Sequence, residues 1–438
     1  MKYFGTDGIR STFNNSFLNE DFAFSLAEAL ASFILKKQIK ERQVVIGHDT
    51  RPSGKPLLNA FLLGLNNKGF TGISAGVIPT PALAFATMKK KMAMGVMITA
   101  SHNPVQDNGF KFFTSLGTKL SDSEEAEIEN MIFQNRRPKI VHDSKSLEII
   151  DSYIDHLMNF FPQDLLKNKK VVVDLSNGAT QKTTPRLFEK LGAEVKVYND
   201  GSGKINDGVG SEYPSMMANK VKELKADFGI AHDGDGDRVI FCDSVGNIIP
   251  GDKILGLLAI NEKQQHRLIN NGLVATIHSN SGLDASLKER GIKLHRAEVG
   301  DRKVAEMMRE RGCNIGGESS GHVVASDYLP TGDGLLTALL VARASYESKR
   351  TIDSLSEDIV LWPSLEGSFK VKEKIPIQEC DLLSSTLSNL KVSLGNQGRV
   401  LLRYSGTEPK VRLLVEAIEQ NKAKEAYDSL SKTIVKSL

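Results

Sequence analysis

The sequence predicts an α/β protein built from three tandem domains with mixed or parallel sheets, followed by a smaller C-terminal α+β domain. The main observation is a recurring pattern in which a short apolar run leads into a polar, glycine-containing loop and then an amphipathic helix. The pattern occurs at 43–54, 170–179 and 272–282. Continuous β-branched runs bounded by such loops are typical of buried parallel strands covered by helices on both faces. The length of 438 residues fits about three domains of ordinary size, or four small ones.

Local composition suggests where these domains meet. A polar, basic stretch lies near 136–150, Pro250 precedes a strongly apolar helix, and Trp362-Pro363 interrupts the chain. From Gly367 onward the pattern changes to strand, helix, strand, strand, helix. The predicted domains are 1–150, 151–250, 251–362 and 363–438. One large α/β domain with long loops is the alternative interpretation.

The charge balance and the short apolar runs argue against a nucleic-acid-binding or membrane-spanning protein. Lys and Arg total 56 and Asp and Glu total 53, so the net charge is only +3, which argues against a nucleic-acid or anionic-membrane partner recognised by bulk charge. The longest apolar runs, such as 254–260, are far shorter than the ~20 residues that span a bilayer. The first residues lack the apolar segment of a signal peptide, and Cys242, Cys313 and Cys380 are scattered without metal-type spacing. We therefore expect a cytoplasmic protein; a homodimer is compatible with the sequence, which does not specify the oligomeric state.

A candidate nucleophile stands where a predicted strand ends in small polar residues, at 95–104. Pro104 prevents the following residues from continuing the strand, and ligands of open α/β sheets bind at the carboxyl ends of strands. Ser101 is the candidate nucleophile. His102 follows it directly, so in extended backbone it is expected to point away from Ser101 and to be a poor base for it. A capping serine in a tight turn is the alternative.

Three aspartates alternate with glycines in the segment His232-Asp233-Gly234-Asp235-Gly236-Asp237. The glycines allow the backbone to bring three carboxylates around one hard cation, and Mg²⁺ suits few carboxylates completed by water or phosphate oxygen. An Asp/Gly turn is the alternative, but carboxylates this close repel one another unless a positive charge neutralises them. The segment therefore predicts a magnesium site.

Two further loops carry polar groups suited to a phosphorylated sugar. The loop 316–322 presents Glu318, Ser320 and His322 between glycines, a surface that suits a polyol. A later strand delivers Arg403 to a Ser-Gly-Thr turn, whose hydroxyl and N–H groups can bind an anion beside the guanidinium. Each loop alone is also compatible with a plain surface turn.

Taken in order along the whole chain, these four motifs resemble the α-D-phosphohexomutase family. The segments 2–10, 95–104 and 107–113 are most similar to the bacterial branch of the family that acts on glucosamine phosphates. The resemblance implies interconversion of glucosamine 6-phosphate and glucosamine 1-phosphate, on the way to UDP-N-acetylglucosamine. It also implies three similar α/β domains and a smaller fourth around one central cleft.

The resemblance also implies a role for each matching residue. Ser101 corresponds to the phosphoserine, and with Asp233, Asp235 and Asp237 it would hold one Mg²⁺ per chain. Arg10, Lys111 and Arg238 would lie around the phosphoryl group that is transferred. Glu318 and Ser320 would bind the sugar hydroxyls, with His322 nearby. The phosphate that is not transferred would be bound by Arg403, Ser405, Gly406 and Thr407. In this scheme Lys111 is a candidate base for the attacking hydroxyl, which would require a lowered pKa. A sugar 1,6-bisphosphate would be both the intermediate and the activator that reloads Ser101.

Other functions remain open. Ser319 stands where the glucosamine branch usually carries Gln, so a phosphomannomutase or phosphoglucomutase of the same family is the first alternative. Asp235 to Val239 also fits the D-x-D-x-[TV] pattern of aspartyl-phosphate phosphohydrolases, although that function leaves Ser101 and Arg403 unexplained. A non-catalytic phosphosugar-binding protein would need neither Ser101 nor the clustered aspartates.

Overall fold

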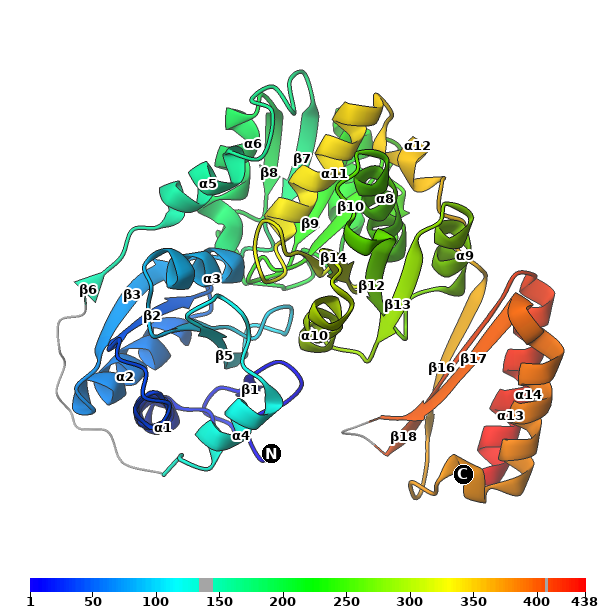
Figure 1. Ribbon diagram of the computed structural model, residues 1–438, viewed down its shortest axis with the longest axis horizontal. Helices are drawn as coiled ribbons and strands as arrows, with labels where there is room; N and C mark the ends of the chain where they lie inside the picture. Colours follow the sequence, from blue (N-terminus) through cyan, green and yellow to red (C-terminus); the bar gives the residue numbers. More distant parts are fainter. Residues whose placement is uncertain (134–144, 406–408) are drawn as a thin grey trace. The chain divides into compact units, whose positions relative to one another are not determined.

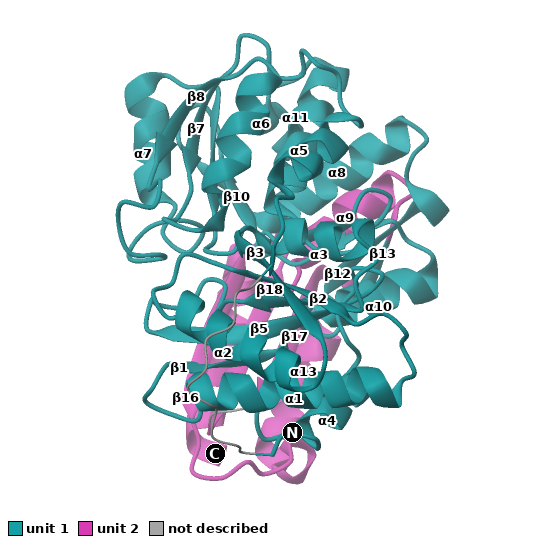
Figure 2. Ribbon diagram, turned by 90° about the vertical axis from the view of Figure 1, so that its left-hand side faces the viewer, with its two compact units in different colours: residues 1–277, 294–356 teal, residues 278–293, 357–438 magenta. Residues whose placement is uncertain are grey.

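The computed structural model describes residues 1–133, 145–405 and 409–438, and these form four β-sheets with flanking helices (Figure 1). They group into two compact units: unit 1 contains residues 1–277 and 294–356, and unit 2 contains residues 278–293 and 357–438 (Figure 2). The predicted fold class is confirmed by this architecture. The domain boundaries stay a prediction, and much of the one near 136–150 lies outside the described residues.

The first sheet is mixed, because a parallel centre is extended on one side by antiparallel strands. Its strands, in spatial order, are β1 (Ile9–Thr12), β5 (Asp107–Thr114), β4 (Met94–Ile98), β2 (Gln43–His48), β3 (Thr71–Val77) and β6 (Lys145–Ser146). The helices of this region are α1 (Glu20–Lys36), α2 (Gly54–Asn67), α3 (Thr80–Lys89) and α4 (Asp122–Glu129). Val44 and Ile46 of β2 pack into one core with α1 and α2, while the buried Val45 between them faces the other side of the sheet. Both faces of β2 are therefore covered.

The second and third sheets also belong to unit 1, except that Lys293, the first residue of β13, lies in unit 2. The second contains β11 (Ile248–Ile249), β10 (Val239–Cys242), β9 (Phe228–His232), β7 (Lys170–Asp174) and β8 (Glu194–Tyr198). The third contains β13 (Lys293–Ala297), β12 (Gly272–Thr276), β14 (Ile315–Gly317) and β15 (Val323–Ala325). Their helices are α5 (Ile150–Met158), α6 (Thr184–Lys190), α7 (Ser215–Leu224), α8 (Gly251–Gln264), α10 (Asp301–Arg311), α11 (Gly334–Ser348) and α12 (Ile352–Ser356), with the 3-10 turns η1 (Ala179–Lys182) and η2 (Ile269–Asn271). The runs predicted as parallel strands form β2, β7 and β12, and each pairs in parallel with a neighbour.

Unit 2 is an antiparallel sheet packed against two helices. Its elements are α9 (Ser281–Glu289), β16 (Ser364–Lys370), η3 (Ile377–Glu379), α13 (Asp381–Leu394), η4 (Gly395–Gln397), β17 (Gly398–Tyr404), β18 (Lys410–Ala417) and α14 (Gln420–Ser437). β18 is the central strand, and its alternate residues Val411, Leu413 and Val415 enter a core with residues of α13 and α14. The predicted order of strand, helix, strand, strand, helix is confirmed. In the described part of the chain no helix is both long enough and apolar enough to span a bilayer.

Candidate active site

Ser101 lies three residues beyond the end of β4, in a turn that is closed to solvent. Its φ is +53°, in the left-handed region, and the residue is 1% exposed. This conformation turns the side chain toward the loop after β9, where Ser101 Oγ donates a hydrogen bond of 2.7 Å to Asp233 Oδ2. Two segments separated by 132 residues therefore meet at one hydroxyl.

One buried arginine, Arg51, makes several hydrogen bonds to the turn that contains Ser101. Arg51 follows β2 and pairs with Asp49 Oδ2 at 3.0 Å, and its guanidinium also donates to the carbonyls of Ser101 (3.0 Å), Asn103 (2.7 Å), Asp107 (2.9 Å) and Pro104. One planar cation thus gathers four carbonyl groups of a single loop, which the fixed fork of donors in arginine allows. These bonds fix the backbone of the turn that carries Ser101.

The structure corrects the expectation for His102. The prediction assumed extended backbone at Ser101, but the left-handed φ brings His102 Nδ1 to 3.4 Å from Ser101 Oγ. Burial, followed by the charges of Arg238 and Arg10, lowers the pKa of His102 to about 4. His102 is therefore near the hydroxyl but is a weak base at neutral pH.

The three aspartates converge as predicted. They occupy the loop between β9 and β10, they are at most 2% exposed, and one oxygen of each lies within 4.8 Å of the others. Lys111 on β5 donates from Nζ to Asp235 Oδ2 (2.8 Å) and Asp237 Oδ2 (2.7 Å), and Thr80 Oγ1 donates to Asp235 Oδ2 at 2.5 Å. The glycines between the aspartates are required, since Gly236 has a φ of +73°.

Asp233 and Asp237 of the cluster differ in how their pKa values are shifted. Burial, with the neighbouring charges of Asp235 and Asp237, raises the pKa of Asp233 well above its usual value. Burial also raises the pKa of Asp237, but Lys111, His322, Lys119 and Arg238 together outweigh burial, so the net pKa of Asp237 is lowered. Lys111 itself has a pKa well above the ordinary value, because Asp235 and Asp237 outweigh its burial. The lowered pKa that a lysine base requires is therefore not found in this geometry, and the role of Lys111 as a base stays a prediction.

The donor set fits a hard divalent cation. Among the described residues, Asp235 Oδ1 and Asp237 Oδ1 are buried and have no hydrogen-bond partner. Unpaired buried carboxylate oxygens are costly unless a positive charge is bound to them. Ser101 Oγ, hydrogen-bonded to Asp233, completes an all-oxygen set of the kind that Mg²⁺ prefers. The acidic cluster could therefore hold one metal ion.

A pocket of about 410 Å³ in unit 1 adjoins the acidic cluster. Arg10, Arg238, Glu318 and His322 all line it, together with Asp237. Arg10 is paired with Asp7 at 2.6 Å, and the pKa of both arginines is raised, because nearby carboxylates outweigh the lowering effect of burial. Five sequence-predicted residues from the regions of three different sheets thus line one cavity, whereas Ser101, Lys111, Asp233 and Asp235 are not among its lining residues.

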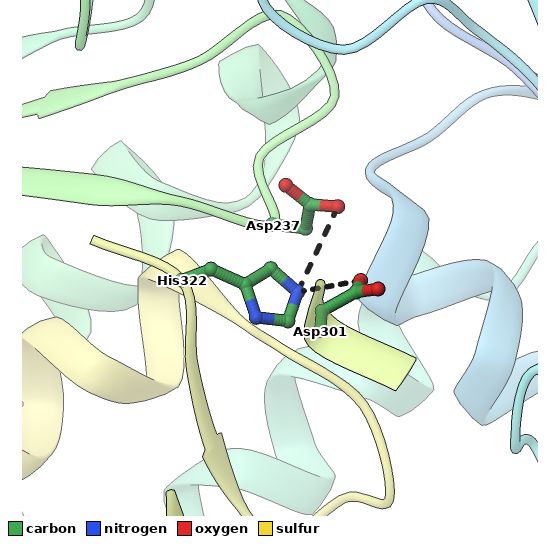
Figure 3. Close-up of side chains that lie close together, drawn as sticks. All are labelled: Asp237, Asp301 and His322. Carbon is green, nitrogen blue, oxygen red and sulfur yellow. Dashed lines mark ion pairs between the residues drawn. The ribbon is translucent and has the colours of Figure 1, made fainter. Parts of the chain in front are cut away.

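A second group of titratable side chains forms one wall of that pocket. His322 Nε2 lies 3.3 Å from Asp301 Oδ2 and 4.0 Å from Asp237 Oδ2 (Figure 3). Neither ring nitrogen of His322 makes a hydrogen bond within the described residues, although the ring is only 3% exposed. Lys119 forms ion pairs with both Asp7 and Asp301. The imidazole therefore stands with Nε2 near two carboxylates, without a hydrogen bond to either.

The predicted sugar-binding loop is only partly at the pocket. Glu318 accepts a hydrogen bond of 3.0 Å from the Gly300 amide and lines the cavity. Ser320 is not among the lining residues, and its hydroxyl is buried without a partner in the described structure. Glu318 is thus positioned by the turn before α10.

The residues predicted to bind the second phosphate belong to unit 2. Arg403 is near the end of β17 and donates from Nη2 to His278 Nε2 at 2.8 Å. Ser405 is buried, and its amide donates to the Lys410 carbonyl at 2.8 Å. Gly406 and Thr407 lie outside the described residues.

Sequence reasoning missed several groups at the site. Asp49 and Arg51 carry a signal that could have been used, because they follow a parallel strand at the same sheet edge as Ser101. Asn206 donates to the Ser101 carbonyl at 2.7 Å from a long loop, and Lys119 and Asp301 meet across 182 residues. No local pattern marks those three.

Comparison with known proteins agrees with this geometry. Four phosphoglucomutase/phosphomannomutase domain families match in order: α/β/α domains I (residues 1–139), II (151–246) and III (250–361), and the C-terminal domain (368–432). The chain belongs to the phosphoglucomutase/phosphomannomutase family, the α-D-phosphohexomutases, so the predicted family is confirmed. This membership favours an isomerase over the phosphohydrolase and binding-protein alternatives.

Two similar proteins within the family match this chain over nearly its whole length. The chain is 41% identical over 434 residues to a protein named phosphoglucosamine mutase from Nautilia profundicola, covering 97% of each chain. It is 41% identical over 449 residues to one of the same name from Campylobacter fetus, covering 100% of each. Both are full-length matches.

Solved structures share the fold. A phosphoglucomutase/phosphomannomutase family protein from Burkholderia thailandensis has a TM-score of 0.81 at 23% identity, covering 99% of this chain and 97% of its own. The Aspergillus fumigatus N-acetylphosphoglucosamine mutase, solved in complex with GlcNAc-6P and magnesium, has a TM-score of 0.68 at 16% identity, covering 99% and 95%.

Proposed function

We propose that this chain interconverts glucosamine 6-phosphate and glucosamine 1-phosphate, with Ser101 as the phosphoryl carrier. The observation that carries the proposal is the 2.7 Å hydrogen bond from Ser101 Oγ to Asp233 Oδ2 within three buried aspartates. The full-length identity to relatives named phosphoglucosamine mutase supports the choice of sugar.

The reaction consists of two phosphoryl transfers. In the first, the C1 oxygen of glucosamine 6-phosphate forms a bond to phosphorus, the bond between phosphorus and Ser101 Oγ breaks, the C1 hydroxyl proton passes to a base, and Ser101 Oγ takes up a proton. In the second, Ser101 Oγ loses its proton and bonds to the C6 phosphoryl group of the resulting 1,6-bisphosphate, the bond between phosphorus and the C6 oxygen breaks, and that oxygen takes up a proton as glucosamine 1-phosphate forms. A Mg²⁺ ion held by Asp233, Asp235 and Asp237 would supply positive charge to the transferring group.

Side chains of the site would also stabilise the transferring phosphoryl group and accept a proton. Arg10 and Arg238 place positive charge at the pocket adjoining the aspartates, where a phosphoryl group carries about −1.5 to −2. Lys111 donates hydrogen bonds to Asp235 and Asp237 and offsets their negative charge. We assign the role of proton acceptor to His322, because it lines the same pocket and neither of its ring nitrogens makes a hydrogen bond within the described residues.

The substrate must bind in two orientations. Arg403, Ser405, Gly406 and Thr407 would bind whichever phosphate is not being transferred. Glu318 would hydrogen-bond ring hydroxyls from its place in the pocket wall. A bisphosphate that escapes between the two steps leaves Ser101 unphosphorylated, so added sugar 1,6-bisphosphate is expected to restore activity.

The sugar preference is tested by comparing kcat/KM for glucosamine, glucose and mannose 6-phosphates under identical bisphosphate priming. We expect glucosamine 6-phosphate to be preferred, with measurable turnover of glucose phosphate because Ser319 is short and exposed. A pocket without a dedicated polar contact discriminates only ~10- to 200-fold. The Ser319→Gln variant is the matched comparison and is expected to sharpen the preference. Equal or better turnover of a glucose or mannose phosphate by the unmodified protein would contradict the choice of sugar and leave a phosphoglucomutase or phosphomannomutase.

A further inference from the structure

Unit 2 contains a strongly basic pocket on its sheet. Arg403 of β17 and Arg412 of β18 are direct cross-strand partners, an arrangement in which like charges repel. They line a cavity of about 380 Å³ together with Lys410, Glu366 and His278. Glu366 is the one acidic side chain among those lining residues, so the cavity has an excess of positive charge suited to an anion.

His278 stands out in this pocket because it contacts the arginine that is expected to bind phosphate. The distance from Arg403 Nη2 to His278 Nε2 is 2.8 Å. A guanidinium has only donors, so Nε2 must accept, and the imidazole must be neutral with its proton on Nδ1. This contact fixes one edge of the guanidinium, while Arg403 Nε is buried without a partner among the described residues.

The surroundings of His278 favour the neutral ring. Burial lowers its pKa first, and the charges of Arg403, Arg399 and Arg412 lower it further. Arg403 of β17, Arg412 and Lys410 of β18 and Glu366 of β16 are the other charged residues among the described lining of the pocket. Arg399 of β17 is outside that lining and is ion-paired with Glu416 at 3.0 Å. These effects favour the neutral ring, whose Nε2 can accept a hydrogen bond.

We propose that His278 is a positioning residue for phosphate binding, orienting the Arg403 guanidinium through the Nε2 contact so that its remaining N–H groups face a phosphate in the pocket. This inference rests on the proposed role of Arg403 in the mutase reaction. It concerns the hold on the phosphate that stays in place, so it acts on substrate affinity rather than on the transfer step.

The test compares His278→Leu, which fills the site without an acceptor, with His278→Gln, whose amide oxygen reaches a position similar to that of Nε2. We expect His278→Leu to raise KM for glucosamine 6-phosphate by about tenfold with little change in kcat, and His278→Gln to recover most of the affinity. In the Arg403→Ala background, His278→Leu is expected to add nothing, because the two residues act as one unit. The exposed His266→Gln serves as the control for histidine replacement.

The pH dependence gives a readout that a merely structural role would not move. Protonation of His278 removes the acceptor, so the KM of the wild type relative to that of His278→Gln is expected to rise as the pH falls through the lowered pKa of His278. Because both proteins bind the same substrate, titration of its phosphate cancels in this ratio. A flat ratio, an unchanged KM in His278→Leu, or equal losses in the Leu and Gln variants would overturn the inference. An unchanged KM in Arg403→Ala would instead overturn the proposed phosphate clamp.

Discussion

Replacing Arg51 with lysine tests how the Ser101 turn is held in place. Arg51 makes five side-chain hydrogen bonds, one to Asp49 and four to carbonyls of the loop that contains Ser101. Lysine keeps the charge but has three donors on a single atom, so at least two of the five acceptors lose their partner. A fully buried acceptor left unpaired costs about 1–3 kcal/mol, and the partly buried carbonyls of Asn103, Pro104 and Asp107 cost less, so the expected loss is about 1–3 kcal/mol.

The assay is urea unfolding followed by circular dichroism, together with turnover of glucosamine 6-phosphate. We expect Arg51→Lys to lower the free energy of unfolding by that amount and to reduce kcat strongly, because the Ser101 carbonyl loses its restraint. Arg42→Lys is the matched control: Arg42 is exposed and stacks on Phe70, a contact that lysine can retain. A change below about 1 kcal/mol in Arg51→Lys, or full turnover, would refute this account of the turn.

Three further predictions concern the acidic cluster and its surroundings. Chelation is expected to abolish turnover, and added Mg²⁺ is expected to restore it. The Asp235→Asn variant is expected to bind the metal more weakly, as measured by calorimetry. Full activity in excess chelator would contradict the metal site. Lys111→Met is expected to destabilise the metal-free protein by about 3–5 kcal/mol, because buried carboxylates lose their counter-charge, and Mg²⁺ is expected to raise its melting temperature more than that of the wild type; equal shifts would contradict this. Asp333 is buried, and burial raises its pKa to about 6 from 3.8, so its stabilising contribution is complete below pH 3.8 and is lost as the pH rises to 6. The unfolding free energy of Asp333→Asn relative to wild type is therefore expected to increase by about 2 kcal/mol between pH 4 and pH 7, and a pH-independent difference in urea titrations would count against it.

Much of the fold could be predicted because it depends on local patterns. The β-branched runs at 43–48 and 170–174 are buried in the parallel parts of mixed sheets, so hydrophobicity alone identifies them. Ser101 and Asp233 could be expected to meet, since both follow strands whose carboxyl ends are typical ligand sites. Those parts of the site follow from rules that act over a few residues.

The rest of the site depends on contacts between distant segments. The left-handed φ of Ser101, which brings His102 close, is imposed by the turn and has no sequence signal because serine rarely adopts it. The raised pKa of Lys111 arises from carboxylates more than a hundred residues away. Asn206 reaches the Ser101 carbonyl from a loop without a motif. Such features are specified by tertiary packing and could not be read locally.

The measurement that tests the central claim most directly is the location of the phosphoryl group. The purified protein is incubated with glucose 1,6-bisphosphate, digested, and mapped by mass spectrometry beside the Ser101→Ala variant. The account predicts one added phosphoryl group on the peptide that contains Ser101, its loss when glucosamine 6-phosphate is added, and neither label nor turnover in Ser101→Ala. Turnover by Ser101→Ala comparable to that of the wild type, or a phosphoryl group carried by another residue such as Asp235, would contradict it.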